Sequence, residues 1–221
     1  MKRFTAGAIG LFAASALAVL GTPVTVQELG IGANEVVNIT SSNLGGDVYA
    51  GVVKLSVNGT LTDSFCIDPW HWSSGNTSYD LIPLVNDSKP PEHIDAATAL
   101  QIEQLWTLYY TPSISPQDAA GLQIAIWDLV AASAAKYLGG TATQASLFHV
   151  NGYDWGASEM INTLPTNTIP ADLAAVTSLV DGKVLDGQDY VVPGVPDGGA
   201  TLVLLGSGLL ALMGIRRRLS A

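Results

Sequence analysis

The sequence predicts an α+β fold, in which an antiparallel β portion precedes a helical portion within a single domain. Two observations support this prediction. Apolar residues alternate with polar ones around an Asn-Gly pair in the first third of the chain, which is typical of a β-hairpin. Apolar residues then recur at helical spacing over residues 95–110 and 116–138. With 221 residues, the chain has room for one domain, which we expect at residues 22–192.

Three strands are expected in the β portion. The first two lie at residues 36–40 and 47–57, where apolar side chains alternate. Asn58-Gly59 comes next and favours a type I′ turn, because both central positions of that turn need a positive φ angle. The return strand is therefore expected at residues 60–68.

The return strand contains the only cysteine of the chain, Cys66. Since side chains alternate across a strand, Phe65 belongs to one face and Cys66 to the other. The face with Cys66 is the more polar one and has three further members: Thr62, Ser64 and Asp68. A cysteine that only packs in the core would more usually lie on the apolar face, so this placement makes Cys66 a candidate site residue.

The second predicted helix carries a glutamine within an apolar run. Ser115 is a good N-cap for this helix, and Pro116 suits its first position. Gln123 lies about two turns into the helix, at the edge of its apolar stripe, and Trp127 follows one turn later. The amide of Gln123 can therefore face a neighbouring element.

The remaining segments give weaker patterns. Residues 81–91 contain three prolines and are expected to be irregular. Residues 171–180 are expected to form a short helix, and residues 184–192 a last strand. The sequence has neither a zinc-ligand spacing nor a phosphate-binding glycine loop, so no metal and no cofactor are expected.

Residues 1–21 have the three parts of a secretory signal peptide. Lys2 and Arg3 form a basic start, and an apolar run follows at residues 6–20. A small-x-small cleavage pattern occurs at residues 16–18. The apolar run is shorter than the roughly 20 residues of a membrane-spanning helix, so we expect the segment to be removed after export.

The C-terminal residues 193–221 also have three parts. A short motif comes first: Val195, Pro196, Asp197, Gly198 and Gly199. An apolar stretch at residues 200–215 is expected to form a transmembrane helix. A basic stop follows it: Arg216, Arg217 and Arg218. These arginines would hold the end of the chain in the cytoplasm.

This order of motif, hydrophobic helix and basic stop resembles the PEP-CTERM sorting signals of Gram-negative bacteria, in the VPDSG-type variant. Asp197 stands where the commonest form has glutamate, and Gly198-Gly199 replaces the second proline. The resemblance implies that the helix anchors the protein transiently in the inner membrane and that an exosortase-type enzyme cleaves near the motif. The mature protein would then reach the cell surface or the extracellular matrix.

Without its two terminal segments, the predicted domain is strongly acidic. It keeps four lysines, no arginine and eighteen acidic residues, which gives a formal charge of −14. A domain that binds nucleic acid needs a basic surface, so this composition argues against nucleic acid as a partner. It suits a soluble domain outside the cell.

The export signals make the unpaired Cys66 informative, because compartments outside the cytoplasm oxidise free thiols. Four roles are open for it: an inert buried side chain, a partner in an intermolecular disulfide, the nucleophile of a cysteine hydrolase, or half of an internal covalent bond. A hydrolase would need a histidine base, for which His71 and His149 are the candidates.

Two short motifs favour the internal bond. They are Phe65-Cys66-Ile67-Asp68 and Leu122-Gln123-Ile124-Ala125-Ile126-Trp127. In this order, on a predicted strand and a predicted helix, they resemble the thioester domains of bacterial surface adhesins. The resemblance implies a thioester between the Cys66 sulfur and the side-chain carbonyl carbon of Gln123, with Asp68 and Trp127 as supporting residues. The 57 positions between Cys66 and Gln123 indicate a smaller domain than in those adhesins.

An internal thioester implies covalent attachment to an amine or hydroxyl group of a partner whose identity the sequence leaves open. Each molecule would react once, so the protein is not expected to be an enzyme with turnover. We expect it to act in adhesion at the cell surface or in the extracellular matrix. Two alternatives remain: a noncovalent structural protein of the extracellular matrix or biofilm without a thioester, and a cysteine hydrolase.

Overall fold

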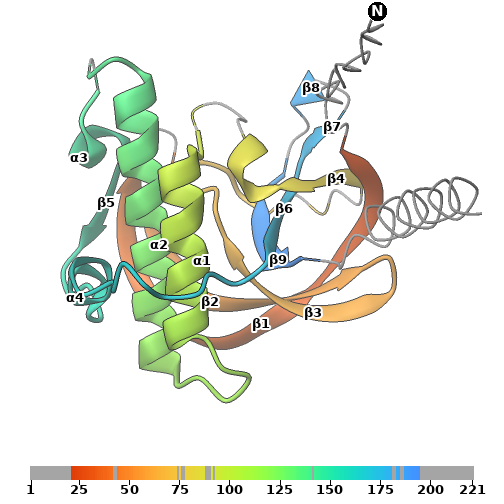
Figure 1. Cartoon of the computed structure of the whole chain (residues 1–221), viewed down its shortest axis with the longest axis horizontal. Coiled ribbons are helices and arrows are strands. Elements are labelled where there is room, and N and C mark those ends of the chain that lie inside the picture. The colour runs from red at the N-terminus through yellow and green to blue at the C-terminus, as the bar shows by residue number, and fades with distance from the viewer. Residues whose placement is uncertain are drawn as a thin grey trace, which may run out of the picture.

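The computed structural model describes residues 21–41, 44–73, 75, 78–87, 91, 93–140, 142–180, 183–184 and 187–194. The predicted signal peptide, apart from Gly21, and the sorting motif with its hydrophobic stretch lie outside these ranges. In the described part of the chain, a curved set of strands packs against two long helices (Figure 1).

The strands of the described residues follow the chain in two groups. Those before the helices are β1 (Thr22–Ser41), β2 (Gly45–Val57), β3 (Thr60–Cys66) and β4 (Ser78–Pro83). The strands that come after the two long helices are β5 (Phe148–Asn151), β6 (Leu173–Thr177), β7 (Leu179–Val180), β8 (Lys183–Val184) and β9 (Tyr190–Pro193). The helices are η1 (Leu84–Asn86), α1 (Ala96–Tyr109), α2 (Pro116–Tyr137), α3 (Gln144–Leu147) and α4 (Ala157–Asn162).

Six of the strands form a closed ring of antiparallel pairs. β1 pairs with β4 at its start, with β2 over most of its length and with β5 at its end. β3 pairs first with β2 and then with β9. β9 pairs with β6, and β6 with β4, which closes the ring at β1. The α+β class is thus confirmed as a mostly antiparallel sheet with a few helices.

The hairpin between β2 and β3 forms where the sequence predicts it. Asn58 and Gly59 have φ angles of 49° and 84°, as a type I′ turn requires. The pairing of β2 with β3 extends from the turn to Val53 and Ser64. The last residues of β3 pair instead with β9, so the edge of Cys66 that faces away from β9 is open to another element.

The second predicted helix is the central helix of the fold, α2. As expected, the Ser115 hydroxyl caps its start by accepting a hydrogen bond from the main-chain nitrogen of Asp118 at 3.1 Å. The helix contacts strands on one side and α1 and α4 on others, so its buried residues extend around most of its circumference. Gly121 permits one of these contacts, because a Cβ there would lie 2.3 Å from the carbonyl oxygen of Trp155.

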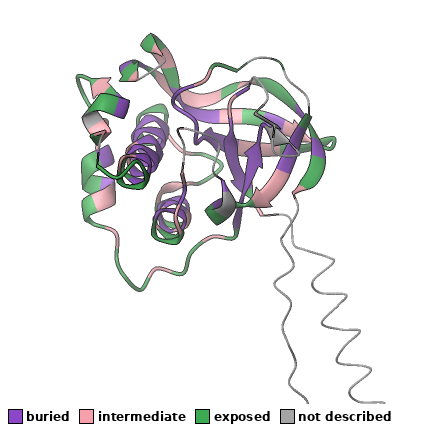
Figure 2. Ribbon diagram, turned by 90° about the horizontal axis from the view of Figure 1, so that it is seen from above, coloured by how far each residue is buried: buried purple, intermediate pink, exposed green. Residues whose placement is uncertain are grey.

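Two hydrophobic clusters stabilise the fold. The larger one lies between the sheet and the helices and includes Phe65, Cys66 and Trp127. The smaller one is formed by side chains of the ring strands: Val24, Val26, Leu55, Tyr79, Ala174, Val176, Tyr190 and Val192. Figure 2 looks along the two long helices and shows their buried sides turned toward the buried strands. Cys66 thus belongs to the main core of the protein.

The prediction of a short helix at residues 171–180 is wrong. This stretch contains the strands β6 and β7. All five residues of β6 are buried, because β6 lies inside the sheet between β4 and β9. A strand that is covered on both faces has a continuous apolar sequence, which periodicity cannot distinguish from a helix.

Other predicted boundaries also differ from the structure. β1 begins well before residue 36, and β4 and η1 occupy the start of the supposedly irregular residues 81–91. β3 ends two residues before Asp68, and the strand expected at 184–192 is divided between β8 and β9. The sequence did not indicate β5, α3 or α4. β5, for example, is held by its pairing with the end of β1, which lies far away in the sequence.

Candidate functional site

Cys66 and Gln123 meet where β3 leaves β2. Cys66 is the last residue of β3, and Gln123 lies in the first half of α2. The main-chain N–H of Cys66 donates to Oε1 of Gln123 at 2.9 Å, and Nε2 of Gln123 donates to the main-chain carbonyl of Cys66 at 2.7 Å. The amide thus pairs with the edge of Cys66 that β2 leaves open, much as a residue of a neighbouring strand would.

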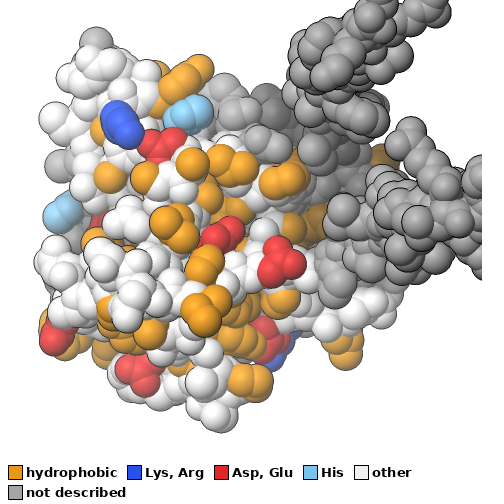
Figure 3. Space-filling model, in the orientation of Figure 1, with side chains coloured by type: hydrophobic (Ala, Val, Ile, Leu, Met, Phe, Trp, Pro, Cys, Tyr) orange, Lys and Arg blue, Asp and Glu red, His pale blue; other side chains and the backbone are white. Residues whose placement is uncertain are grey.

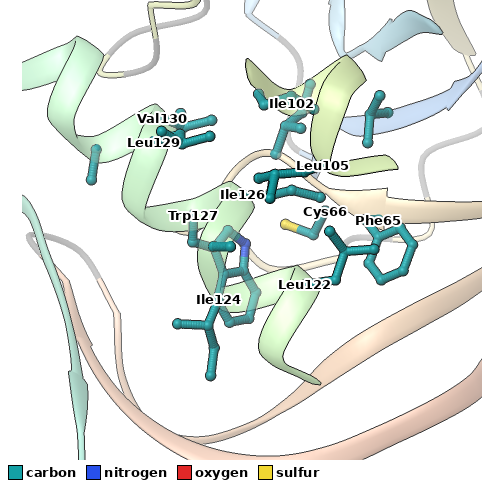
Figure 4. Close-up of a cluster of buried hydrophobic side chains, with 14 of the residues drawn as sticks. Phe65, Cys66, Ile102, Leu105, Leu122, Ile124, Ile126, Trp127, Leu129 and Val130 are labelled. Carbon is teal, nitrogen blue, oxygen red and sulfur yellow. The ribbon is translucent and has the colours of Figure 1, made fainter. Parts of the chain in front are cut away.

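The thiol of Cys66 lies in the hydrophobic cluster under α1 and α2. Figure 4 shows its sulfur directed toward α2, among Leu122, Ile126 and Trp127. The sulfur donates a hydrogen bond to the main-chain carbonyl of Asp68 and accepts one from the N–H of Asp68, both at 3.2 Å. These two bonds fix the thiol within the turn that follows β3.

The expectation that Cys66 lies on a polar face is wrong for this end of β3. Cys66 is only 3% exposed, and Phe65 on the opposite face is also buried. The helices cover one face and β9 continues the sheet alongside. The alternation of side chains along β3 therefore no longer separates a solvent-exposed face from a buried one. The polar neighbours Ser64 and Asp68 are themselves fully buried and hydrogen-bonded.

Burial raises the pKa of the Cys66 thiol far above its ordinary value, because a thiolate at this position would lose its hydration. The negative charges of Asp68 and Asp189 raise this pKa further, and an interaction with the indole of Trp127 acts in the opposite direction. The thiol is therefore neutral at neutral pH. It is a poor nucleophile toward reagents in solution, because thiolates carry the reactivity of cysteine.

Trp127 supplies a buried N–H donor beside the sulfur. Its Nε1 has no hydrogen-bond partner of ordinary geometry among the described residues. Figure 4 shows the indole nitrogen on the side of the ring that faces Cys66. The ring is held from behind by edge-on packing against Phe148, with 5.5 Å between the ring centroids. A donor in this position is available to a sulfur that acquires negative charge.

A cavity of about 250 Å³ reaches this group of residues. Cys66, Gln123 and Trp127 are among the residues that line it. Tyr49 and Trp72 also line it and are more than half exposed, so the cavity is open to solvent at that side. A small group in the cavity can therefore approach the buried amide of Gln123.

The cavity has an acidic lining. Glu28 and Asp47 line it, and none of its described lining residues is lysine or arginine. The surface in Figure 3 has a similar balance, with acidic side chains scattered among hydrophobic ones and few basic side chains. An acidic cavity attracts a cationic group, such as a protonated amine, more strongly than an anionic one.

Asp68 holds His71 beside the same cavity. Nδ1 of His71 lies 2.8 Å from both carboxylate oxygens of Asp68, which is fully buried. The main-chain N–H of Trp70 donates to the same carboxylate at 3.1 Å. Nε2 of Gln188 donates to the main-chain carbonyls of Asp68 and His71, at 3.3 Å each. The turn after β3 is thereby fixed with the imidazole of His71 at the cavity wall.

The structure brings together all four site residues that the sequence suggested, Cys66, Gln123, Asp68 and Trp127. Sequence reasoning missed the association of His71 with Asp68, although their i, i+3 spacing in a turn is a signal for such a contact. It also missed Gln188 and Glu28, which come from distant segments and had no local signal. His149, the other candidate base, lies on β5 and is not among the residues that line the cavity.

Residues 194–219 match the family described as the VPDSG-CTERM motif. The chain carries a PEP-CTERM-type sorting motif. This motif supports export to the cell surface and processing by an exosortase-type enzyme, and it includes every sorting residue that the sequence suggested, from Val195 to Arg218. No curated protein and no solved structure matches the chain.

The described residues contain neither a membrane-spanning helix nor a metal-binding cluster. None of their helices is long and apolar enough to cross a membrane, and the hydrophobic stretch at 200–215 lies outside them. Their histidine, cysteine and acidic side chains form no group of three that could hold a metal ion.

Proposed function

We propose that the protein is an exported surface protein in which Cys66 and Gln123 form an internal thioester, and that this thioester attaches the protein covalently to a partner. The observation that carries the proposal is the double hydrogen bond between the Gln123 amide and the main chain of Cys66, at the wall of an open cavity. The sorting motif supports the location at the cell surface.

The first step would join the two side chains. The Cys66 sulfur adds to the carbonyl carbon of Gln123, the carbon–nitrogen bond breaks, and the thiol proton leaves with Nε2 as ammonia. The main-chain N–H of Cys66 already points at Oε1, where negative charge develops in the tetrahedral intermediate. Because both groups are held in place by the fold, the step gains the large effective concentration of an intramolecular reaction.

The apolar surroundings favour the product of this step. A thiolate at Cys66 is disfavoured by burial, whereas a thioester is neutral and has no charge to desolvate. Trp127 and the apolar residues of α2 would also restrict access of water to the thioester. Burial that makes Cys66 unreactive as a free thiol is therefore compatible with a stored thioester.

The second step would consume the thioester. An amine or hydroxyl group in the cavity attacks the carbonyl carbon, the carbon–sulfur bond breaks, and Cys66 is released as a thiol. The Gln123 side chain then carries the partner through an amide or ester bond. Glu28 and Asp47 favour partners that present an amine. Each molecule reacts once, as expected for adhesion rather than for an enzyme with turnover.

The same geometry gives a specific basis for the noncovalent alternative. The Gln123 amide satisfies the two main-chain groups that β2 leaves open, which is a structural role in its own right. The hydrolase alternative has less support. The hydrogen bonds of the Cys66 sulfur go to the main chain of Asp68, and the raised pKa of the thiol is the opposite of what a catalytic cysteine needs.

Intact mass of the freshly purified chain without its terminal segments tests the proposal. The wild-type protein should be lighter than its sequence by one ammonia, and this deficit should be absent from Cys66→Ala and Gln123→Ala. Gln104→Ala is a matched control, because Gln104 is a buried glutamine of α1 whose amide binds the carbonyl of Thr168 instead, and it should keep the deficit. A wild-type protein of full mass would leave the noncovalent structural role as the better account.

A further inference from the structure

Among the described residues that line the cavity beside Cys66 and Gln123, one is a histidine, His71. The His71 side chain is 25% exposed, whereas its partner Asp68 is fully buried. The pair therefore has one member in contact with the cavity and one in the protein interior. This arrangement differs from a surface ion pair, because the buried carboxylate fixes the orientation of the ring.

The contact with Asp68 also fixes which nitrogen of the ring can accept a proton. An ionised carboxylate can only accept hydrogen bonds, so Nδ1 must carry the proton where it meets Asp68. In the neutral ring, Nε2 is then the basic nitrogen.

The turn that carries this pair is anchored on several sides. Nε1 of Trp70 donates to the carbonyl of Leu147 at 2.8 Å, and Trp70 is almost fully buried. Gln188 binds the main chain at both ends of the turn. The same turn holds the Cys66 sulfur through Asp68, so His71 and the reacting sulfur belong to one rigid unit.

We propose that His71, oriented by Asp68, transfers the proton of the incoming nucleophile to the departing Cys66 sulfur. This inference rests on the proposed thioester. A neutral amine would attack the carbonyl carbon of Gln123 to form a carbon–nitrogen bond. Nε2 of His71 would take the proton from that nitrogen, the carbon–sulfur bond would break, and the proton would pass to Sγ of Cys66. The products are an amide, a thiol and neutral His71.

A proton donor for the sulfur is needed because of where the sulfur lies. Burial raises the pKa of Cys66, so an unprotonated thiolate would be a poor leaving group in this site. Trp127 can stabilise partial charge on the sulfur but cannot give up its proton. Among the described residues, the acids Glu28 and Asp47 line the same cavity as His71, and the acids Asp68 and Asp189 act on Cys66.

The test compares the rates at which two nucleophiles react with the wild-type protein and with His71→Gln. His71→Asn serves as a second variant, and circular dichroism checks that each variant is folded. Methylamine needs a base to remove its proton after it adds to a thioester, whereas the hydroxylamine adduct loses its proton readily to water. We expect His71→Gln to keep the ammonia deficit and to react with methylamine on the order of 100-fold more slowly. Its reaction with hydroxylamine should change much less.

Two further measurements separate proton transfer from a structural role. Added imidazole should accelerate the methylamine reaction of His71→Gln or His71→Asn in proportion to its concentration, and should not accelerate that of the wild type. His149 is not among the residues that line the cavity, so His149→Gln should react as the wild type does. Equal slowing of both nucleophiles without rescue, or no slowing at all, would overturn the role of His71 alone. A wild-type protein without the deficit would overturn the thioester and this role together.

Discussion

The side-chain amide of Gln123 hydrogen-bonds both main-chain groups of Cys66, although 57 positions separate the two residues in the sequence. The amide takes the place of a strand residue at the point where β2 and β3 part. This contact positions the carbonyl carbon of Gln123 at the residue whose sulfur would attack it. It is therefore the common basis of the structural role and of the proposed thioester.

The structural part of this contact can be measured without the thioester. In a Cys66→Ala background no thioester can form, and the amide keeps its two hydrogen bonds. Adding Gln123→Leu should lower the free energy of unfolding by about 3 kcal/mol, because a buried N–H and a buried carbonyl lose their partners. Urea denaturation of the single and double variants gives the difference.

A matched control is available on α1. Gln104 is also buried, but its amide makes one long hydrogen bond, of 3.5 Å, to the carbonyl of Thr168. In the same background, Gln104→Leu should therefore lower the free energy of unfolding clearly less than Gln123→Leu does. Equal losses would mean that the pairing with Cys66 has no special weight in stability.

The raised pKa of Cys66 predicts a pH dependence of stability when the thiol is free. In Gln123→Ala, the unfolded state loses the thiol proton near pH 9, the ordinary value, while the folded state retains it. The contribution of the buried neutral thiol to the free energy of unfolding is therefore complete below pH 9. It is lost as the pH rises above 9, by up to about 1.4 kcal/mol per pH unit.

Tyrosines titrate in the same alkaline range, so the comparison needs a partner variant. Cys66→Ala combined with Gln123→Ala keeps every tyrosine and lacks the thiol. The difference in unfolding free energy between the two variants, measured from pH 7 to pH 10, isolates Cys66. A difference that does not change with pH would contradict a buried neutral thiol.

Gly121→Ala should disrupt the contact between α2 and the turn before α4. A Cβ at this position would meet the carbonyl oxygen of Trp155 at 2.3 Å, and main-chain atoms cannot move away at low cost. We expect a loss of about 3 kcal/mol in unfolding free energy. Gly45→Ala is the control, because its Cβ would have its nearest contact at 3.7 Å, and it should be nearly neutral by thermal denaturation.

Asp95→Ala should destabilise the start of α1. Asp95 accepts a hydrogen bond from the main-chain nitrogen of Thr98 at 2.9 Å and binds Nζ of Lys136 at 2.8 Å. Loss of the N-cap should cost about 1 kcal/mol. Lys136→Ala should cost less than about 0.5 kcal/mol, because the lysine is largely exposed. Similar losses in urea denaturation would show that the ion pair, rather than the cap, stabilises this end.

The sequence predicted some features well because they depend on neighbouring residues. The turn at Asn58-Gly59 follows from the φ angles that these residues tolerate, and the start of α2 follows from the cap at Ser115. Segments such as β6 were misjudged, because their state depends on strands far away in the chain. The proximity of Cys66 and Gln123 was suggested by the motifs, but their hydrogen bonds were not.

By itself, the sequence determined the hairpin that ends in Cys66, the helix that carries Gln123 and the sorting motif at the C-terminus. Local φ preferences, caps and a linear motif are sufficient for these. Only the tertiary structure decided that Cys66 is buried, that the Gln123 amide pairs with its main chain, and that Asp68 holds His71 at the cavity. Burial and pairing depend on elements that are distant in the sequence and meet only in the folded protein. The residues adjacent in the sequence therefore do not indicate these contacts.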